Sequence, residues 1–519
     1  MAEPFYITTA ISYPNGPPHI GHAYEAIATD AIARFQRLKG RDVFFLTGTD
    51  EHGLKMAQMA RERGLEPAAF AAEMSAKFKA MDDALDISYD RFIRTTEPVH
   101  HQASKALWEA MTAKGDLYLG RYEGWYSVRE EAYYGEEELV VAESGEKLSP
   151  LGSEVEWTVE ESWFFRLSAY QDRLLAHYRD HPEFIRPESR RNEVLRFVEG
   201  GLTDLSISRT SFDWGVKVPD SPNHVMYVWL DALTNYLTGV GYPGDTDVYR
   251  RYWPADLHII GKDVVRFHAI YWPAFLMSAG IALPKQVFGH GWLLSRGEKM
   301  SKSVGNVIDP HDLIRAFGVD PLRYFLLREV TFGQDGGYTT EAIVARVNAD
   351  LANSFGNLAQ RTLTFIARNL AGAPPVTGKG DEADEALLAL VREASRTLLP
   401  RHFEALELSQ GIEAWLRAVF ACNQYIDAQA PWTLKKTDPE RMKAVLATLY
   451  EAIIDLAIAI QPVIPGSAAR LLDAIGVPAA ERSYAALEDD GRYARLATSG
   501  FVLAPPEPIF PRLEAPAAG

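Results

Sequence analysis

The first fifty residues constrain the fold more than any other part of the chain, because strand-like and helix-like patterns alternate there. Residues 5–11 form a short β-prone run, and apolar side chains then recur at steps of three and four across residues 19–38. Lys39 and Gly40 provide the cation and the glycine that commonly end a helix. Residues 42–47 (DVFFLT) are almost continuously apolar, as in a strand buried on both faces of a sheet. This order predicts an α/β fold built on a Rossmann-like, doubly wound parallel sheet.

Two other regions of the chain show different patterns. Residues 116–220 are rich in aromatic, β-branched and turn-forming residues, which predicts an inserted mixed α/β region with antiparallel strands. The α/β pattern of the first region returns at residues 225–230 and 258–261. Residues 341–475 show helical periodicity without strand-like alternation, and this pattern predicts an all-helical bundle.

The acidic composition of the chain argues against nucleic-acid binding when it is taken alone. The 519 residues include 53 Lys and Arg against 70 Asp and Glu, a formal net charge of −17, whereas nucleic-acid binders usually show a basic surface. Between Arg129 and Glu161 there are 11 acids and 2 bases, a net charge of −9 within the insertion. We therefore expect the insertion to present a solvated acidic face.

Cys422 is the only cysteine, which excludes a disulfide framework and a cysteine-rich zinc site and fits a reducing cytoplasm. The N-terminus has no basic segment followed by an apolar core, so no secretion signal is predicted. The longest apolar stretch, residues 449–464, contains Glu451, Asp455 and Gln461 and repeats at helical spacing. We expect a buried helix there and no membrane span.

His19-Ile20-Gly21-His22 lies at the start of the first predicted helix, after a strand and a proline-rich turn. A helix N-terminus offers free N–H groups and the positive end of the helix dipole, which suits phosphate. The two imidazoles are three residues apart on one face of the first turn, and Gly21 leaves room for a nucleotide to approach the backbone. Alone the motif is weak, because two histidines at a helix start also occur by chance.

Lys299-Met300-Ser301-Lys302-Ser303 lies in a segment flanked by glycine and serine, residues 295–306. Two lysines in such a loop form a cationic arm that suits a polyphosphate. Taken alone, a solvated surface loop is the more usual explanation of the same residues.

Together, the HIGH and KMSKS segments, about 280 residues apart, resemble the signatures of class I aminoacyl-tRNA synthetases. The chain has neither a P-loop pattern nor a convincing G-x-G-x-x-G pattern, so the P-loop and dinucleotide-binding alternatives lack support. Further segments resemble the methionyl-tRNA synthetase family, in that family's order and essentially from end to end. They are TAISYPNGPPHIGH (9–22), TGTDEHG (47–53), YVWLDALTNY (227–236), GKDVVRFHAIYW (261–272) and FGNLAQR (355–361).

The resemblance implies a two-step ligase reaction. L-Methionine and ATP, accompanied by Mg²⁺, give methionyl-adenylate and pyrophosphate. Methionine then passes to the 3′-terminal ribose of methionine tRNA, initiator and elongator.

The resemblance also implies a methionine pocket in which Asp50 binds the ammonium group. Around the side chain it implies Ile11, Tyr13, Trp229, Ala232, Leu233, Tyr236, Val264, His268 and Trp272. A polarizable thioether packs well against aromatic edges, so the chemistry is suitable. The family commonly has Pro at the position of Leu233 and Ile at that of Val264. On spacing alone, the simpler interpretation is that these aromatic side chains belong to the hydrophobic core.

ATP and tRNA contacts are implied in the same way. For ATP they are His19, Gly21, His22, Gly261, Asp263, Lys299 and Lys302, with the two histidines and two lysines as catalytic groups. Arg209 matches a family arginine near the active site, without an assigned role. For the anticodon they are Asn353, Asn357 and Arg361, four apart on one helix face, and Trp432, which would stack on a base. A polar helix face and a packed tryptophan are the plainer alternative.

The implied domains follow the sequence patterns. They are a catalytic domain in two halves (1–115 and 221–294), a connective insertion (116–220), a KMSKS loop and stem-contact region (295–340), a helical anticodon-binding domain (341–480) and a partly extended C-terminal tail (481–519). The insertion lacks the Cys-x-x-Cys pairs of zinc-binding relatives, so we expect no structural zinc and no metal ligands. Longer relatives append a dimer-forming domain, for which no room remains before Gly519, so we expect a cytoplasmic monomer.

Other classes of protein remain open on the sequence. A synthetase for isoleucine, leucine or valine usually carries a large editing insertion, and one for cysteine usually binds zinc through thiols. A small-molecule nucleotidylyltransferase shares the HxGH phosphate site but does not need the helical region. An inactive synthetase relative that only binds RNA would have lost His or Lys residues from the two signatures, yet all four are present.

Overall fold

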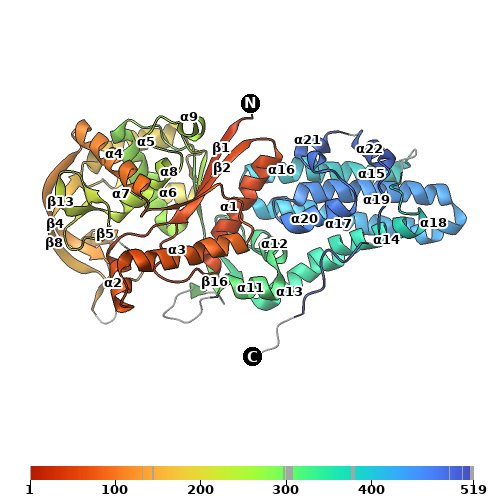
Figure 1. Ribbon diagram of the computed structural model, residues 1–519, viewed down its shortest axis with the longest axis horizontal. Helices are drawn as coiled ribbons and strands as arrows, with labels where there is room; N and C mark the ends of the chain where they lie inside the picture. The colour runs from red at the N-terminus through yellow and green to blue at the C-terminus, as the bar shows by residue number, and fades with distance from the viewer. Residues whose placement is uncertain are drawn as a thin grey trace.

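The computed structural model describes residues 2–130, 132–142, 145–295, 298–299, 308–375, 380–489, 491–504 and 506–514. These residues form an elongated molecule with a sheet-containing lobe at one end and a helical lobe at the other (Figure 1). The first two strands and helix α1 lie close to the junction of the two lobes.

A six-stranded parallel sheet forms the centre of the first lobe. Its strands are β1 (Pro4–Thr9), β2 (Asp42–Thr49), β3 (Arg91–Arg94), β9 (Ile185–Arg186), β14 (Leu257–Gly261) and β15 (Val287–His290). They lie in the order β3-β2-β1-β14-β15-β9, and each adjacent pair is parallel. The winding direction reverses between β1 and β14, where a doubly wound sheet opens a crevice at the carboxyl ends of its strands. The predicted fold class is confirmed, and the crevice is the expected place for a ligand.

Helix α1 (Ile20–Leu38) packs on one face of this sheet and begins and ends close to the predicted positions. Ile27 is fully buried between the helix and the sheet. His19 is the N-cap residue, and the helix is followed by Gly40 in the left-handed region, at φ 88°. The remaining helices before the insertion are α2 (Leu54–Glu62), α3 (Pro67–Ala84) and α4 (Pro98–Lys114).

The insertion contains the predicted antiparallel strands. β4 (Leu117–Ser127) pairs with β8 (Glu156–Phe165) over almost its full length. Strand β9 comes from the same stretch of sequence yet forms the edge of the main sheet, so residues 116–220 are not wholly separate from the catalytic lobe. The shorter elements are β5 (Ala132–Tyr134), β6 (Val140–Val141), β7 (Lys147–Leu148), α5 (Gln171–Asp180), α6 (Glu188–Glu199), β10 (Leu205–Ser206), β11 (Ser208–Arg209) and β12 (Lys217–Val218).

The second half of the catalytic lobe leads into a connecting region. The lobe is completed by β13 (Ser221–Met226), α7 (Val228–Leu233), α8 (Asn235–Thr238), α9 (Asp247–Tyr252) and α10 (Trp272–Ala279). The connecting region contains β16 (Leu293–Ser295), β17 (Glu298–Lys299), α11 (Pro310–Phe317), α12 (Val319–Glu329) and β18 (Gly336–Tyr338).

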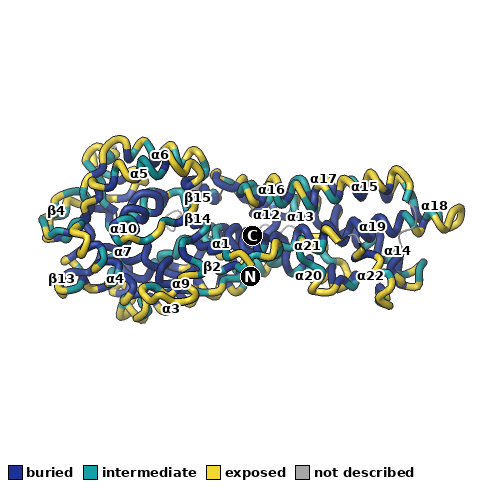
Figure 2. The backbone as a smooth tube through the Cα atoms, turned by 90° about the horizontal axis from the view of Figure 1, so that it is seen from above, coloured by how far each residue is buried: buried dark blue, intermediate teal, exposed yellow. Residues whose placement is uncertain are grey.

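The helical lobe confirms the all-α prediction. Its main helices are α13 (Thr340–Val347), α14 (Asn357–Asn369), α15 (Glu382–Arg392), α16 (Leu399–Glu404), α17 (Leu408–Gln429), α18 (Pro431–Thr437), α19 (Pro439–Ile460) and α20 (Pro465–Ala474). Figure 2 shows α19 buried along most of its length at the centre of the lobe, and α18 exposed at the far end. In the described part of the chain, no helix is long and apolar enough to cross a membrane.

The C-terminal segment contains two short helices, α21 (Tyr484–Leu487) and α22 (Arg492–Thr498), before an extended run. This run packs against the helical lobe. The Leu503 N–H donates to the carbonyl of Gly372 at 2.8 Å, and the Leu513 N–H donates to the Asn348 side chain at 2.8 Å. The extended run is thus tied to the helical lobe at Leu503 and at Leu513.

Candidate functional site

A cavity of about 550 Å³ lies at the crevice between β1 and β14. Most of the sequence-predicted pocket residues line it, although they come from segments far apart in the chain. They are Ile11, Tyr13, His22, Asp50, Trp229, Ala232, Leu233, Tyr236, Gly261, Asp263, Val264 and His268. The structure therefore brings the implied methionine residues and part of the implied ATP set to a single place.

The deep end of the cavity is neutral and aromatic. The Tyr236 hydroxyl lies 2.7 Å from Nε2 of His268, whose Nδ1 lies 3.0 Å from the Val264 carbonyl. Because a carbonyl only accepts, His268 Nδ1 carries the proton, and the Tyr236 hydroxyl donates to Nε2. Burial lowers the pKa of His268 to about 4 and raises the pKa of Tyr236. Beside this pair, Trp229 stacks on Phe267 with the ring centroids 3.8 Å apart. This end suits an uncharged, polarizable side chain.

Asp50 provides a carboxylate elsewhere on the cavity wall. It follows β2 directly, and its N–H donates to the carbonyl of Ser12 at 2.8 Å, which ties the loop after β2 to the loop after β1. Its residue surface is 7% exposed, so a cation at this carboxylate would be largely shielded from water. The arrangement is that of a cation subsite beside an apolar subsite.

Trp272 and Arg209 do not line this cavity. Trp272 is fully buried, with its ring centroid 6.0 Å from that of Tyr236. The Arg209 guanidinium lies 4.2 Å from the ring centroid of Tyr133 and 5.0 Å from that of Tyr227, and its Nε is 3.5 Å from Glu160. Arg209 thus packs inside an aromatic cluster where the insertion meets the lobe.

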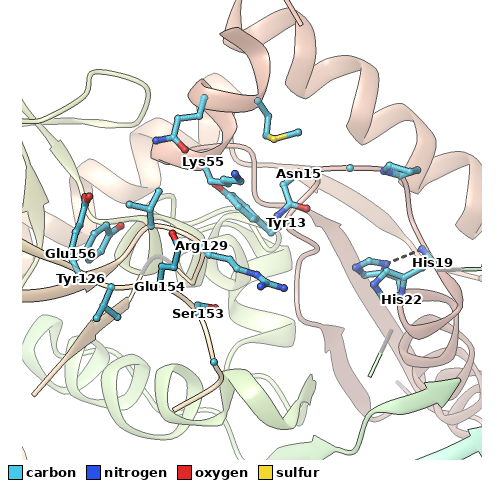
Figure 3. Close-up of a pocket in the computed structure, with 17 residues that line it drawn as sticks. Tyr13, Asn15, His19, His22, Lys55, Tyr126, Arg129, Ser153, Glu154 and Glu156 are labelled. Carbon is cyan, nitrogen blue, oxygen red and sulfur yellow. Dashed lines mark hydrogen bonds between the residues drawn. The ribbon is translucent and has the colours of Figure 1, made fainter. Parts of the chain in front are cut away.

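His19 and His22 line a second, larger cleft of about 910 Å³ that adjoins the first cavity (Figure 3). The His22 ring lies 3.8 Å from the His19 ring, centroid to centroid. Lys55 and Arg129 also line this cleft, from α2 and from the insertion respectively. Tyr13, His22 and Arg129 line both cavities, so the two form one continuous site.

The N–H groups at the start of α1 are already hydrogen bonded. The Gly21 N–H donates to Nδ1 of His19 at 3.0 Å, and the His19 N–H donates to Nδ1 of His22 at 3.1 Å. The Ile20 N–H donates to the carbonyl of Ile308 at 3.2 Å. The expectation of free N–H groups is therefore wrong for this conformation, and His19 is also a structural cap for the helix. Phosphate could reach the Gly21 N–H only if the His19 ring moved.

Lys302 lies outside the described residues, and so does the side chain of Lys299, whose backbone belongs to β17. The predicted phosphate roles of these lysines therefore stay predictions.

The implied anticodon residues belong to α14, to α18 and, for Asn353, to the turn of helix just before α14, and α14 and α18 lie in the helical lobe (Figure 1). The Arg361 guanidinium lies 5.3 Å from the ring centroid of Trp432, which is 43% exposed on α18. Arg361 also forms an ion pair with Asp427 at 2.8 Å. Asn353 is exposed and Asn357 is half-buried. The helical lobe therefore presents polar and aromatic groups to solvent around these residues.

The sequence did not indicate several residues that line the combined site, Arg129 and Glu25 among them. Arg129 lies in the most acidic segment and could be read only as part of a solvated face. Glu25 lines the cavity and accepts a hydrogen bond from His290 at 2.7 Å. Burial works to lower the pKa of His290, but Glu25, the Gly291 carbonyl and Asp263 together outweigh burial, and the pKa is raised. No local pattern joins residues 265 positions apart, so this pair could not be predicted.

The doubly wound sheet, the HIGH cleft and the helical lobe together define a class I tRNA synthetase. The family model "tRNA synthetases class I (M)" matches residues 5–363, and the model "Anticodon binding domain of methionyl tRNA ligase" matches residues 374–517.

Similarity to individual proteins indicates which family of class I synthetases the chain belongs to. The chain is 57% identical over 521 residues to a methionine–tRNA ligase of Mesorhizobium japonicum, covering 99% of each chain. It is 56% identical over 522 residues to one of Mycobacterium tuberculosis, again covering 99% of each. A crystal structure of Mycobacterium tuberculosis methionyl-tRNA synthetase bound by methionyl-adenylate matches with a TM-score of 0.94 and 55% identity, over 98% of this chain and 100% of that one. The chain belongs to the methionyl-tRNA synthetase family.

Proposed function

We infer that the reaction of this family takes place in the cavity between β1 and β14. The chain activates L-methionine with ATP to methionyl-adenylate and pyrophosphate, and transfers methionine to the 3′-terminal ribose of methionine tRNA. The observation that carries this location is the pairing of a shielded Asp50 carboxylate with a neutral Tyr236–His268 end in one cavity. Methionine has the matching features, an ammonium group and an uncharged thioether.

In this proposal Asp50 binds the ammonium group of methionine. The thioether lies against Tyr236 and His268, and the wall is completed by Ile11, Tyr13, Trp229, Ala232, Leu233 and Val264. A neutral imidazole is required there, because an imidazolium would repel the ammonium group and would not suit a soft sulfur. Trp272 supports the wall from behind Tyr236.

The ATP phosphates occupy the adjoining cleft, near His19, Gly21 and His22. Gly261 and Asp263 contact the nucleoside part, and Lys299 and Lys302 complete the cationic surroundings of the phosphates. The methionine carboxylate attacks the α-phosphate, a new P–O bond forms, and the bond to the β-phosphate breaks as pyrophosphate leaves. The ionised carboxylate needs no general base, so catalysis consists of positioning and charge stabilisation.

Mg²⁺ accompanies the ATP phosphates and needs no protein cage. No cluster of three or more His, Cys, Asp or Glu side chains that could bind a metal occurs among the described residues. We propose an insertion without structural zinc, since the sequence has no cysteine in it. Metal analysis of the purified protein tests this point.

We further propose that Asn353, Asn357, Arg361 and Trp432 bind the anticodon of initiator and elongator methionine tRNA alike. The exposed Trp432 ring beside the Arg361 guanidinium supports this, because splayed-out bases stack on such groups. We propose that the enzyme works in the cytoplasm, where charged tRNA is used, and as a monomer, which light scattering can test.

The proposal is tested by tRNA charging with labelled methionine, together with a Lys302→Ala variant. Lys302→Ala should slow methionine-dependent ATP–pyrophosphate exchange by at least about 100-fold and leave the Kd for methionine almost unchanged. An unchanged exchange rate would remove Lys302 from the phosphate site.

A further inference from the structure

Asp231 is a fully buried carboxylate directly behind the cavity wall. It lies on α7, between the lining residues Trp229 and Ala232, but does not line the cavity itself. One carboxylate oxygen lies 2.6 Å from Nδ1 of His52, and the other lies 2.7 Å from Nε2 of His100. The three side chains form a buried cluster to which the mechanism above assigns no role.

The ionisation of this cluster is consistent with its geometry. Burial works to raise the pKa of Asp231, but His52 and His100 outweigh burial, and the pKa is lowered. An ionised carboxylate only accepts, so each imidazole donates an N–H to it. Two charge-assisted hydrogen bonds therefore meet on one buried residue.

The two histidines come from different parts of the lobe. His52 lies two residues after Asp50, in the loop that follows β2. His100 belongs to α4, where its Nδ1 also lies 3.0 Å from the Thr238 hydroxyl. Asp231 thus links α7 to the loop that carries Asp50, and a separate bond fixes α7 to α4.

We propose that Asp231 is a positioning residue for methionine, which sets the distance between the ammonium subsite at Asp50 and the side-chain wall on α7. This inference rests on the methionine roles proposed above for Asp50 and Trp229. His52 carries this constraint from Asp231 to the loop that holds Asp50. His100 keeps α7 in place even when His52 is removed.

Two substitutions at position 52 separate this role from simple core packing. His52→Asn retains an N–H donor near the place of Nδ1, whereas His52→Ala removes it. His52→Ala should raise the KM for methionine about tenfold in ATP–pyrophosphate exchange, the effect of losing about 1.4 kcal/mol, and change the KM for ATP less than about twofold. His52→Asn should recover most of the methionine affinity.

His101→Ala is the matched control. The His101 ring centroid lies 5.3 Å from that of His52, so the two histidines share their surroundings. His101 has no part in the proposed link between Asp231 and His52. His101→Ala should leave the KM for methionine unchanged. Thermal melting confirms that each variant is folded at the assay temperature.

A substrate analogue locates the effect within the pocket. 4-(Methylthio)butanoate has the thioether but no ammonium group, and it is used as an inhibitor of exchange. In His52→Ala its inhibition constant should stay within about twofold of the wild type, because α7 is still tied to His100. Equal weakening of methionine and this analogue, or a lowered melting temperature with unchanged KM, would overturn the positioning role. Failure of the proposed function would show differently, as absence of methionine-dependent exchange in the wild-type protein.

Discussion

Asp30 and Arg323 form an ion pair at the junction of the two lobes, with 2.6 Å between the carboxylate and the guanidinium and neither side chain exposed. Asp30 belongs to α1, the helix that begins at the HIGH segment, and Arg323 belongs to α12. Arg323 also donates to the carbonyls of Pro462 and Val463 at 3.1 and 3.2 Å, just after α19. A single buried side chain therefore connects the catalytic helix to the helical lobe.

Removing Arg323 should destabilise the protein strongly. Arg323→Met removes one of the two arginines paired with the buried Asp30, leaving Arg34, and frees the carbonyl groups of Leu85, Pro462 and Val463, a loss of about 3–5 kcal/mol in the free energy of unfolding. Urea unfolding measures it. Arg315→Met is the control, because Arg315 is 71% exposed in its ion pair with Asp312 and should cost less than about 1 kcal/mol. Equal losses in the free energy of unfolding for the two variants would show that burial adds nothing to the contribution of the Asp30–Arg323 pair.

His268 should make stability dependent on pH. Its pKa is lowered to about 4 in the folded protein, against about 6.5 in the unfolded chain, so unfolding takes up a proton between these values. Stability is fully present above pH 6.5 and falls by up to about 3 kcal/mol as pH decreases to 4. Urea unfolding at a series of pH values should show a shallower decline for His268→Gln. Parallel curves for the two proteins would show that His268 takes up no proton on unfolding.

His19 should have two separable roles. His19→Asn retains an N-cap for α1 but removes the imidazole, whereas His19→Ala removes both. Both variants should slow pyrophosphate exchange by about 100-fold or more if the ring acts on phosphate. Only His19→Ala should also lose about 1 kcal/mol of stability. A His19→Asn enzyme with wild-type exchange would restrict His19 to capping.

Trp432→Ala should affect tRNA and not amino-acid activation. Loss of base stacking, about 1–3 kcal/mol, should lower kcat/KM for tRNA charging roughly 5- to 150-fold and leave exchange within about twofold. Phe420→Ala is the matched control, since Phe420 is also an aromatic residue of the helical lobe and is equally exposed at 43%. Equal loss of charging and exchange would indicate a structural role for Trp432.

Much of the fold follows from local patterns in the sequence. The opening strand, helix and strand lie within two residues of their predicted ends, because periodicity, the helix start and Gly40 all agree. The buried helix expected over residues 449–464 is present as the second half of α19, which ends at Ile460, and its acids Glu451 and Asp455 pair with arginines inside the lobe. Local physics determines these elements, so a sequence alone can indicate them.

The missed features depend on contacts between distant residues. Asp231 meets a histidine 179 positions away, and the Asp30–Arg323 pair spans 293 positions. The sequence places strand β9 in the insertion, because nothing in two residues indicates which sheet they join. Tertiary packing decides both kinds of feature. The His19 cap is different, because it is a local contact with the N–H two residues on, and the HIGH motif by itself indicates only a phosphate role for His19.

In the function proposed here, the cavity between β1 and β14 selects and activates methionine. ATP–pyrophosphate exchange, measured with each of the twenty amino acids in turn, tests it most directly. At low amino-acid concentration, we predict that methionine is the only one of the twenty amino acids to support exchange. Asp50→Ala should lower kcat/KM for methionine by at least about 100-fold. Exchange driven better by another amino acid, or methionine-dependent exchange unaffected by Asp50→Ala, would contradict the account.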